Sequence, residues 1–253
     1  MSDLNENPAS NNSAIKPSEN KHDRADDAIH EKRIRSFVLR QGRMTGLQQR
    51  GISEYLPKLG LTLEDGAFDA AKVFGRKAPL VVEVGFGMGG SLLEQVQAMP
   101  DHNFVGIEVH LPGVGKLLGE AGDLGVDNLR VYHEDAVEVF NQCIPDNSID
   151  LFQLFFPDPW HKKKHNKRRI VQPPFVEVIR KKLKIGGRFH LATDWEAYAE
   201  HMRDVMNNAA GYENTATQGD FVPRPESRPL TKFELRGERL GHGVWDLIYQ
   251  RIN

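Results

Sequence analysis

The stretch Leu80-Val-Val-Glu-Val-Gly-Phe-Gly-Met-Gly-Gly90 decides how the rest of this sequence is interpreted. Its apolar first half is typical of a buried strand, and its glycines mark a tight turn that opens a helix. Gly85, Gly87 and Gly90 have the spacing of a dinucleotide-binding loop. Glu108 closes the next predicted strand, where an acid can accept hydrogen bonds from ribose hydroxyls. A bare strand-to-helix turn is the alternative, but the combination favours a nucleotide site.

Apolar and amphipathic segments alternate beyond this turn. We expect strands at 80–84, 103–109, 129–133, 149–156, 188–193 and 244–251, and helices at 91–99, 175–183 and 196–210. Apolar strands separated by helices indicate a parallel sheet that is covered on both faces. The predicted fold is therefore a doubly wound, mostly parallel α/β domain. The glycines and proline of His110-Leu-Pro-Gly-Val-Gly-Lys116 leave the start of one further helix undefined.

The bulk composition excludes several classes of protein. The net charge is only −2 over 253 residues, so affinity for a polyanion must come from a local cluster of basic side chains. The single cysteine, Cys143, excludes an intrachain disulfide and is expected to be packed in the core. No apolar stretch reaches the roughly 18–20 residues that span a bilayer, so we expect a cytoplasmic protein with no membrane contact.

The chain is expected to have three parts. Residues 1–27 are polar and charged, with few large apolar side chains, and should form a disordered tail. Residues 28–78 are interpreted as an N-terminal arm and helical lead-in, and 79–253 as the α/β domain.

Two further acids distinguish between nucleotides. Glu83 lies just before the glycines, where a carboxylate would repel a pyrophosphate but suit an ammonium group. Asp135 follows the third predicted strand, where it can accept from an adenine amino group or cap the next helix. Three acids at successive strand ends suit S-adenosylmethionine, which has an ammonium, a ribose and an adenine but no phosphate. The residues expected to bind this cofactor are Glu83, Gly85, Gly87, Glu108 and Asp135.

A second motif, Phe155-Phe-Pro-Asp-Pro-Trp160, ends the fourth predicted strand. Asp158 stands between two prolines, which fix the backbone φ on either side of it. Its place at a strand end beside a nucleotide site favours a catalytic role over a surface ion pair with Lys162 or Lys163. Trp160 offers a ring on which an extruded base could stack.

A basic run follows this motif. Its side chains are expected to bind nucleic-acid phosphates, a solvated charged loop being the alternative. They are Lys162, Lys163, Lys164, Lys167, Arg168 and Arg169. His161 and His165 have helical spacing, but without an acidic or cysteine partner nearby we expect no metal site.

Four segments together resemble the bacterial tRNA (guanine-N7-)-methyltransferases. They are Glu83-Val-Gly-Phe-Gly-Met-Gly-Gly90, Gly106-Ile-Glu-Val-His110, Phe155-Phe-Pro-Asp-Pro-Trp-His-Lys-Lys-Lys-His165 and Thr231-Lys-Phe-Glu234. The resemblance runs from about Arg33 to the C-terminus, and the Pro-Asp-Pro-Trp motif is its most specific part. It implies a seven-stranded class I methyltransferase (Rossmann-like) fold. It also implies methyl transfer from S-adenosylmethionine to N7 of a guanine in the variable loop of tRNA.

The resemblance also assigns roles to single residues. Glu83, Glu108 and Asp135 would bind the methyl donor, Asp158 would be catalytic, and Lys162, Asp194, Thr231, Lys232, Phe233 and Glu234 would contact substrate. By their spacing alone, Thr231 and Glu234 also fit a helix capping box, and Asp194 could cap the helix that follows it. Both interpretations stay open at this point.

Two other classes of protein compete with an RNA methyltransferase. An NAD-dependent oxidoreductase would use the glycine loop, but it leaves Glu83 and the basic run without a purpose. A non-catalytic RNA-binding protein on a methyltransferase scaffold would use the basic run, but not the cofactor acids or Asp158. We expect tRNA as the partner and no obligatory protein partner.

Overall fold

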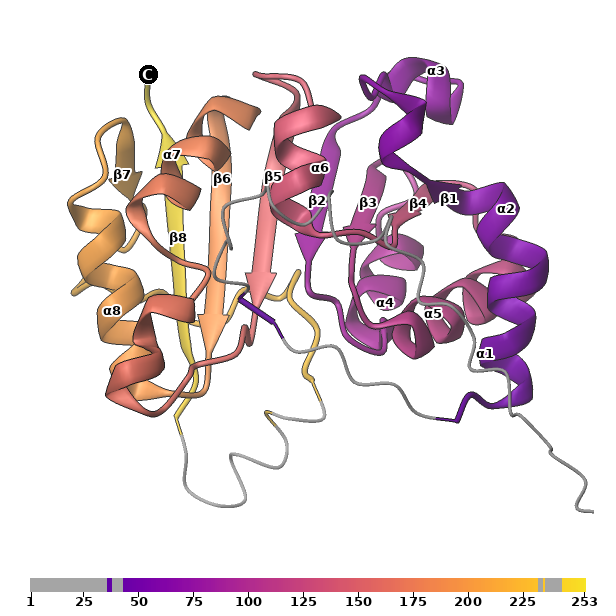
Figure 1. The fold of residues 1–253 in the computed structure, drawn as a ribbon. Coiled ribbons are helices and arrows are strands. Elements are labelled where there is room, and N and C mark those ends of the chain that lie inside the picture. The colour runs from indigo at the N-terminus through magenta and orange to yellow at the C-terminus, as the bar shows by residue number, and fades with distance from the viewer. Residues whose placement is uncertain (1–35, 38–42, 232–233, 235–242) are drawn as a thin grey trace, which may run out of the picture. The chain divides into compact units, whose positions relative to one another are not determined.

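Strands from most of the chain form one eight-stranded sheet with the order β1-β4-β3-β2-β5-β6-β8-β7 (Figure 1). The structure is a computed structural model that describes residues 36–37, 43–231, 234 and 243–253. The predicted tail, 1–27, lies outside the described residues. The strands are β1 (Gly60–Leu61), β2 (Leu80–Val84), β3 (Asn103–Ile107), β4 (Leu129–Tyr132), β5 (Ile149–Phe155), β6 (Leu183–Thr193), β7 (Tyr212–Asn214) and β8 (Trp245–Arg251).

The sheet is parallel from β1 to β6 and antiparallel only where β8 joins β6 and β7. The predicted doubly wound, mostly parallel fold is therefore confirmed. The family resemblance implies seven strands, and the sheet has eight. One of them, β1, comes from the predicted lead-in: Gly60 and Leu61 pair with Val131 and Tyr132 of β4.

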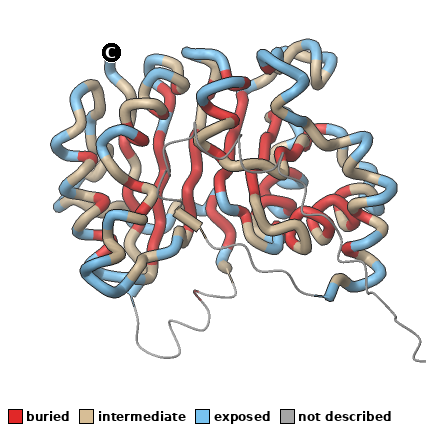
Figure 2. Tube along the Cα trace, viewed as in Figure 1, coloured by how far each residue is buried: buried red, intermediate tan, exposed pale blue. Residues whose placement is uncertain are grey.

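Alternate residues of the strands serve two hydrophobic cores, one on each face of the sheet. Val82 and Val84 of β2 pack with the helices α6 (Ala136–Gln142), α7 (Pro173–Lys182) and α8 (Glu196–Asn207). Val81 packs on the other face with α4 (Gly90–Ala98) and α5 (Leu111–Asp123). Figure 2 shows the buried strands between helices that are exposed on their outer sides. This burial on both faces explains why β2 and β3 are buried at every position.

Short helical segments complete the described part of the chain. They are α1 (Gly46–Arg50), η2 (Gly51–Tyr55), α2 (Leu56–Leu59), η3 (Leu63–Asp65), α3 (Ala70–Phe74) and η4 (Lys163–Arg168). Among the described residues, no helix is both long and apolar enough to cross a membrane.

The predicted elements agree with the observed ones except near their ends. The strand expected at 188–193 begins earlier, at Leu183, directly after α7. The three-residue β7 was not predicted, because a segment of that length has no readable period. The helix whose start the glycines left undefined is α5, and it begins at Leu111 with Pro112 in its first turn, where the missing N–H costs nothing.

The glycines of α5 allow it to lie unusually close to α1 and η2. A Cβ added at Gly115 would overlap the carbonyl oxygen of Gln48, and one added at Gly51 would overlap the carbonyl oxygen of Gly115. A Cβ at Gly119 would come within 2.7 Å of the Leu47 side chain. The glycines of this helix therefore serve close backbone packing and are not helix breakers.

We predict that Gly115→Ala destabilises the protein by about 1–3 kcal/mol, since the added methyl group can be accommodated only if two helices move apart. Gly46→Ala is the matched control, because a Cβ at Gly46 meets nothing within 4 Å and the residue is helical. That change should be neutral or slightly stabilising. Urea denaturation of both variants measures the difference, and equal stabilities would contradict the close-packing interpretation.

Candidate active site

The loops that follow four parallel strands meet at the carboxyl end of the sheet, where open α/β folds hold their ligands. They line one cavity with a volume of about 420 Å³. Four of the predicted cofactor residues and the predicted catalytic residue line it together: Gly85, Gly87, Glu108, Asp135 and Asp158. Sequence reasoning missed several other lining residues, among them Ser36, Phe37, His110, Glu134, Phe155 and Phe156.

The glycine loop is held in place by Glu108. Gly85 and Gly87 both have positive φ angles, 75° and 57°, which the absence of a side chain permits. The N–H of Gly87 donates to Glu108 Oε2 over 2.8 Å. The other oxygen, Oε1, accepts from the N–H groups of Val109 (2.7 Å) and His110 (2.9 Å). One carboxylate thus ties the turn after β2 to the turn after β3.

Asp135 both caps a helix and lines the cavity. Its Oδ1 accepts from the N–H of Val137 over 2.9 Å at the start of α6. The two functions considered for this residue are therefore compatible in the structure. Glu134, its neighbour, adds another carboxylate to the cavity wall.

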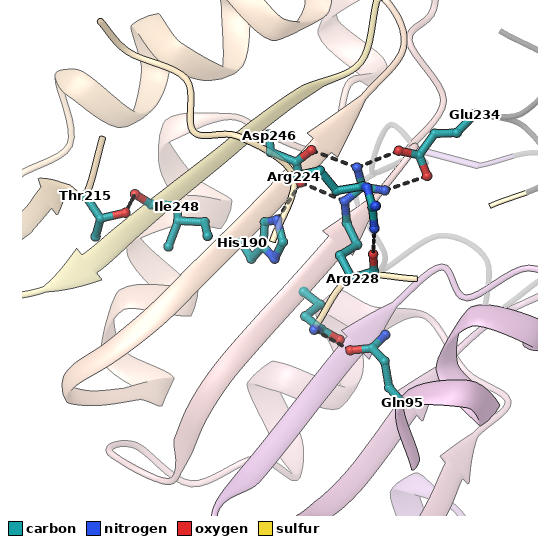
Figure 3. Close-up of polar contacts among 9 residues, drawn as sticks. Gln95, His190, Thr215, Arg224, Arg228, Glu234, Asp246 and Ile248 are labelled. Atoms are coloured by element: carbon teal, nitrogen blue, oxygen red, sulfur yellow. Dashed lines mark hydrogen bonds and ion pairs between the residues drawn. The ribbon is translucent and has the colours of Figure 1, made fainter. Parts of the chain in front are cut away.

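Glu83 lies behind the cavity and not on its wall. It is 4% exposed and is absent from the lining residues. Gln95 Nε2 lies 3.5 Å from its Oε2, and Gln153 Nε2 donates to Gln95 Oε1 over 2.7 Å (Gln95 is labelled in Figure 3). Burial, with the nearby charge of Glu108, raises the pKa of the Glu83 carboxyl from 4.5 to about 8. The position expected to meet an ammonium group is thus a buried carboxyl with a strong tendency to stay protonated.

The loop that carries Asp158 is bounded by two residues in a strained conformation. Phe156 and Trp160 have positive φ angles of 50° and 47°, which non-glycine residues seldom adopt. The Phe156 N–H donates to Ala192 O over 2.8 Å, and Arg169 Nε donates to Pro159 O over 2.9 Å. Asp158 itself is exposed at the cavity and, among the described residues, forms no ion pair with a lysine. The geometry therefore fixes this carboxylate through its backbone and leaves its oxygens uncovered.

Comparisons with known proteins agree with this geometry. Residues 77–247 match the sequence model of the family described as "Putative methyltransferase". A protein named tRNA (guanine-N(7)-)-methyltransferase from Shewanella amazonensis is 58% identical over 227 residues, which are 90% of this chain and 95% of that protein. Another of the same name, from Saccharophagus degradans, is 63% identical over 87% of this chain and 96% of its own length. The chain belongs to the tRNA (guanine-N(7)-)-methyltransferase family.

A solved structure shows the same fold at low sequence identity. The 16S rRNA methyltransferase KamB superposes with a TM-score of 0.55 at 14% identity, over 74% of this chain and 95% of that one. At this identity the likeness supports the class I methyltransferase fold and nothing finer.

The basic run of this family member divides into an exposed part and an internal part. Lys162, Lys163, Lys164 and Lys167 are exposed on and beside η4, and within the described ranges they form no ion pair. The guanidinium of Arg168 lies 3.8 Å from the centre of the Trp160 ring.

Arg169 is turned into the protein. It is 6% exposed, donates to Pro159 O, and lies 4.7 Å from the Tyr198 ring centre. Because burial removes Arg169 from solvent, we leave it out of the expected phosphate-binding surface and assign it to support of the Asp158 loop.

The Thr231–Glu234 segment is anchored by a buried arginine that sequence reasoning missed (Figure 3). Arg228 is 0% exposed, and its guanidinium donates to both oxygens of Glu234 (2.7 and 2.6 Å) and to both oxygens of Asp246 (2.7 Å each). His190 Nε2 lies 2.7 Å from Asp246 Oδ1. Although burial opposes it, the hydrogen bonds from His190 and Arg228 lower the pKa of Asp246.

This network changes how the segment is interpreted. Glu234 is 2% exposed and also accepts from the Thr231 N–H (2.9 Å), while its own N–H donates to Thr231 Oγ1 (3.2 Å). The capping box is therefore formed, and the Glu234 carboxylate is directed to Arg228. Lys232 and Phe233 lie outside the described residues. Asp194 follows β6 and is half-buried.

Replacing Glu83 tests its buried state. The pKa of Glu83 is about 8 in the folded protein and 4.5 in the unfolded chain. Between these two pH values the folded protein therefore holds a proton that the unfolded chain has lost. This group therefore lowers stability as pH rises through that window. We predict that Glu83→Gln becomes more stable relative to wild type from pH 5 to pH 8. Glu64→Gln, at an exposed site, is the control in urea denaturation, and a trend equal in both variants would count against the buried carboxyl.

Removing the buried guanidinium should be costly. Arg228→Met leaves two buried carboxylates without a cation, so we expect the free energy of unfolding to fall by about 3–5 kcal/mol. Arg50→Met is the control, because it removes an arginine whose ion pair with Asp123 is exposed to solvent. Its free energy of unfolding should change little. Chemical denaturation measures both, and similar small losses would show that the Arg228 network is not a support of the fold.

Proposed function

We propose that this chain transfers the methyl group of S-adenosylmethionine to N7 of a guanine in the variable loop of tRNA. The family membership supports the reaction, and one structural observation supports the cofactor. Four carboxylates line the cavity (Glu108, Glu134, Asp135 and Asp158), and the Gly87 N–H is already bonded to Glu108.

This arrangement disfavours an NAD-dependent oxidoreductase. A dinucleotide needs loop N–H groups for its pyrophosphate and an environment without excess negative charge. Here the Gly87 N–H donates to a carboxylate, and the wall carries four acids. A cofactor with a sulfonium and an ammonium, but no phosphate, suits the same wall.

The residues present fit S-adenosylmethionine, which supplies an electrophilic methyl group when bound. Glu108 would accept from its ribose hydroxyls and Asp135 from its adenine amino group, while Gly85 and Gly87 leave open space beside the loop. Glu83 would act from behind the wall, where an approaching ammonium group would favour its ionised form.

Asp158 is proposed to act on the guanine. N7 carries an in-plane lone pair, so its attack needs no prior loss of a proton, but the product base gains positive charge. A carboxylate held beside the base would stabilise this charge more in the transition state than in the neutral ground state. It would also orient the base through its amino and imino hydrogens.

The exposed lysines are proposed to hold the tRNA backbone. Lys162, Lys163, Lys164 and Lys167 stand next to the Asp158 loop, and they contribute attraction for phosphate without base selectivity. A non-catalytic RNA-binding protein would need these lysines but would have no use for an acidic cavity beside them.

A single-turnover assay with unmodified tRNA and labelled methyl donor tests the proposal and separates chemistry from docking. We expect wild type to methylate tRNA and Asp158→Ala to be slowed by about a hundredfold or more, with tRNA affinity little changed. Lys163→Ala combined with Lys164→Ala should instead weaken tRNA binding and reduce the slope of log affinity against log salt by up to about two.

Lys72→Ala combined with Lys77→Ala is the matched control for charge. Both lysines are exposed. Lys72 lies in α3 and Lys77 between α3 and β2, away from the carboxyl end of the sheet (Figure 1). This variant should bind tRNA as wild type does. If Asp158→Ala methylates tRNA at the wild-type rate, the carboxylate has no part in catalysis. If both lysine pairs cause the same loss of tRNA affinity, the basic run contributes only through the overall charge of the protein.

A further inference from the structure

Trp195 is a large aromatic side chain left exposed at the carboxyl end of the sheet. It follows β6 and is 39% exposed. Its backbone is nevertheless well fixed: the N–H donates to Thr193 Oγ1 (3.2 Å), and the carbonyl accepts from the N–H groups of Tyr198 and Ala199 (2.9 Å each). The indole is thus presented to solvent from a rigid position.

His161 holds one side of this indole. The two ring centres lie 4.2 Å apart at an interplanar angle of 72°, an edge-to-face contact. His161 belongs to the loop that carries Asp158, so the contact joins the loop after β5 to the turn after β6. Within the described part of the chain, the indole N–H of Trp195 makes no hydrogen bond.

Trp160, the ring expected from the sequence to stack on a base, is already in use. Arg168 covers it at 3.8 Å, His165 contacts it edge-on at 6.0 Å, and its Nε1 donates to Ser36 O over 3.1 Å. On the face that Arg168 covers, a base could stack only after displacing this guanidinium. Among the described residues, Trp195 has His161 as its ring contact and carries no guanidinium over its ring.

We propose that Trp195, held by His161, is the stacking platform for an unpaired nucleobase that flanks the methylated guanine. This inference rests on the proposed function. Neither residue lines the cavity, so the platform lies outside the pocket that would take the target base. A flanking base, turned out of its stack when the guanine is extruded, needs a new aromatic partner.

Charge supports a nucleotide as the occupant. Trp195 itself stands between Asp194 and Glu196, whereas the exposed lysines 162–164 follow His161 directly. A phosphate backbone beside the platform would therefore be attracted from the His161 side. An apolar protein surface would instead displace water from several lysines and offer no hydrogen-bond acceptors in its place.

Three substitutions at one position test the platform. Trp195→Ala should weaken tRNA binding by about fivefold to 150-fold, the range for loss of one base–aromatic stack. Trp195→Phe should retain most of the affinity, and Trp195→Leu should lose as much as alanine, because it keeps apolar bulk without a π face. The salt slope should stay unchanged in all three, since no phosphate contact is lost.

Ile185→Ala is the control, because Ile185 is 69% exposed and lies near the amino end of β6, at the other end of the strand from Trp195. It should bind tRNA as wild type does, and all variants should bind S-adenosylhomocysteine equally in calorimetry. Wild-type affinity in Trp195→Ala or in Trp195→Leu would overturn the platform while wild-type methylation of tRNA still stands. A Trp195-dependent dimer in sedimentation, with unchanged tRNA affinity, would assign the ring to self-association instead. Failure of wild type to bind and methylate tRNA would remove the proposed function itself.

Discussion

The buried guanidinium of Arg228 is the charge on which the carboxyl end of the sheet depends. A fully desolvated cation is tolerated only when its donors are satisfied, and here Asp246 of β8 and Glu234 provide four oxygens. The same group lies 5.8 Å from the Phe155 ring and 5.6 Å from the Phe156 ring. One ion therefore sets the end of β5, which starts the Asp158 loop, together with the segment before β8.

The same means of support recurs around the cavity. Loops at the carboxyl end of a parallel sheet run past the strand ladder, and side chains satisfy several of their N–H and C=O groups. Glu108 binds three N–H groups of two loops, and Arg169 binds the carbonyl of Pro159. Several charged groups near the site have partners of this kind, whereas the oxygens of Asp158 and the exposed lysines are available to a ligand.

The sequence predicted the sheet and its ligand edge, because apolar period and glycine spacing report directly on strands and turns. It placed Glu108, Asp135 and Asp158 at strand ends, and the structure brings them to one cavity. It could not tell which way a side chain turns. Lysines of the basic run remain in solvent, whereas Arg169 enters the protein, since a planar guanidinium can bind carbonyls and stack on a ring. The role of Arg228 could not be predicted, because its partners Glu234 and Asp246 are six and 18 residues away and meet it only in the folded chain.

The acidic cavity and the basic rim together explain how a near-neutral chain could bring together two ligands of opposite charge. The net charge of −2 hides an acidic wall, built by the loops after β3, β4 and β5, and a lysine-rich surface on the last of these loops. Under the proposed function, tRNA phosphates would be attracted to the lysines and repelled by the carboxylates, while a neutral base pays no such penalty on entering the cavity. The charge pattern would thus admit the base and exclude its backbone.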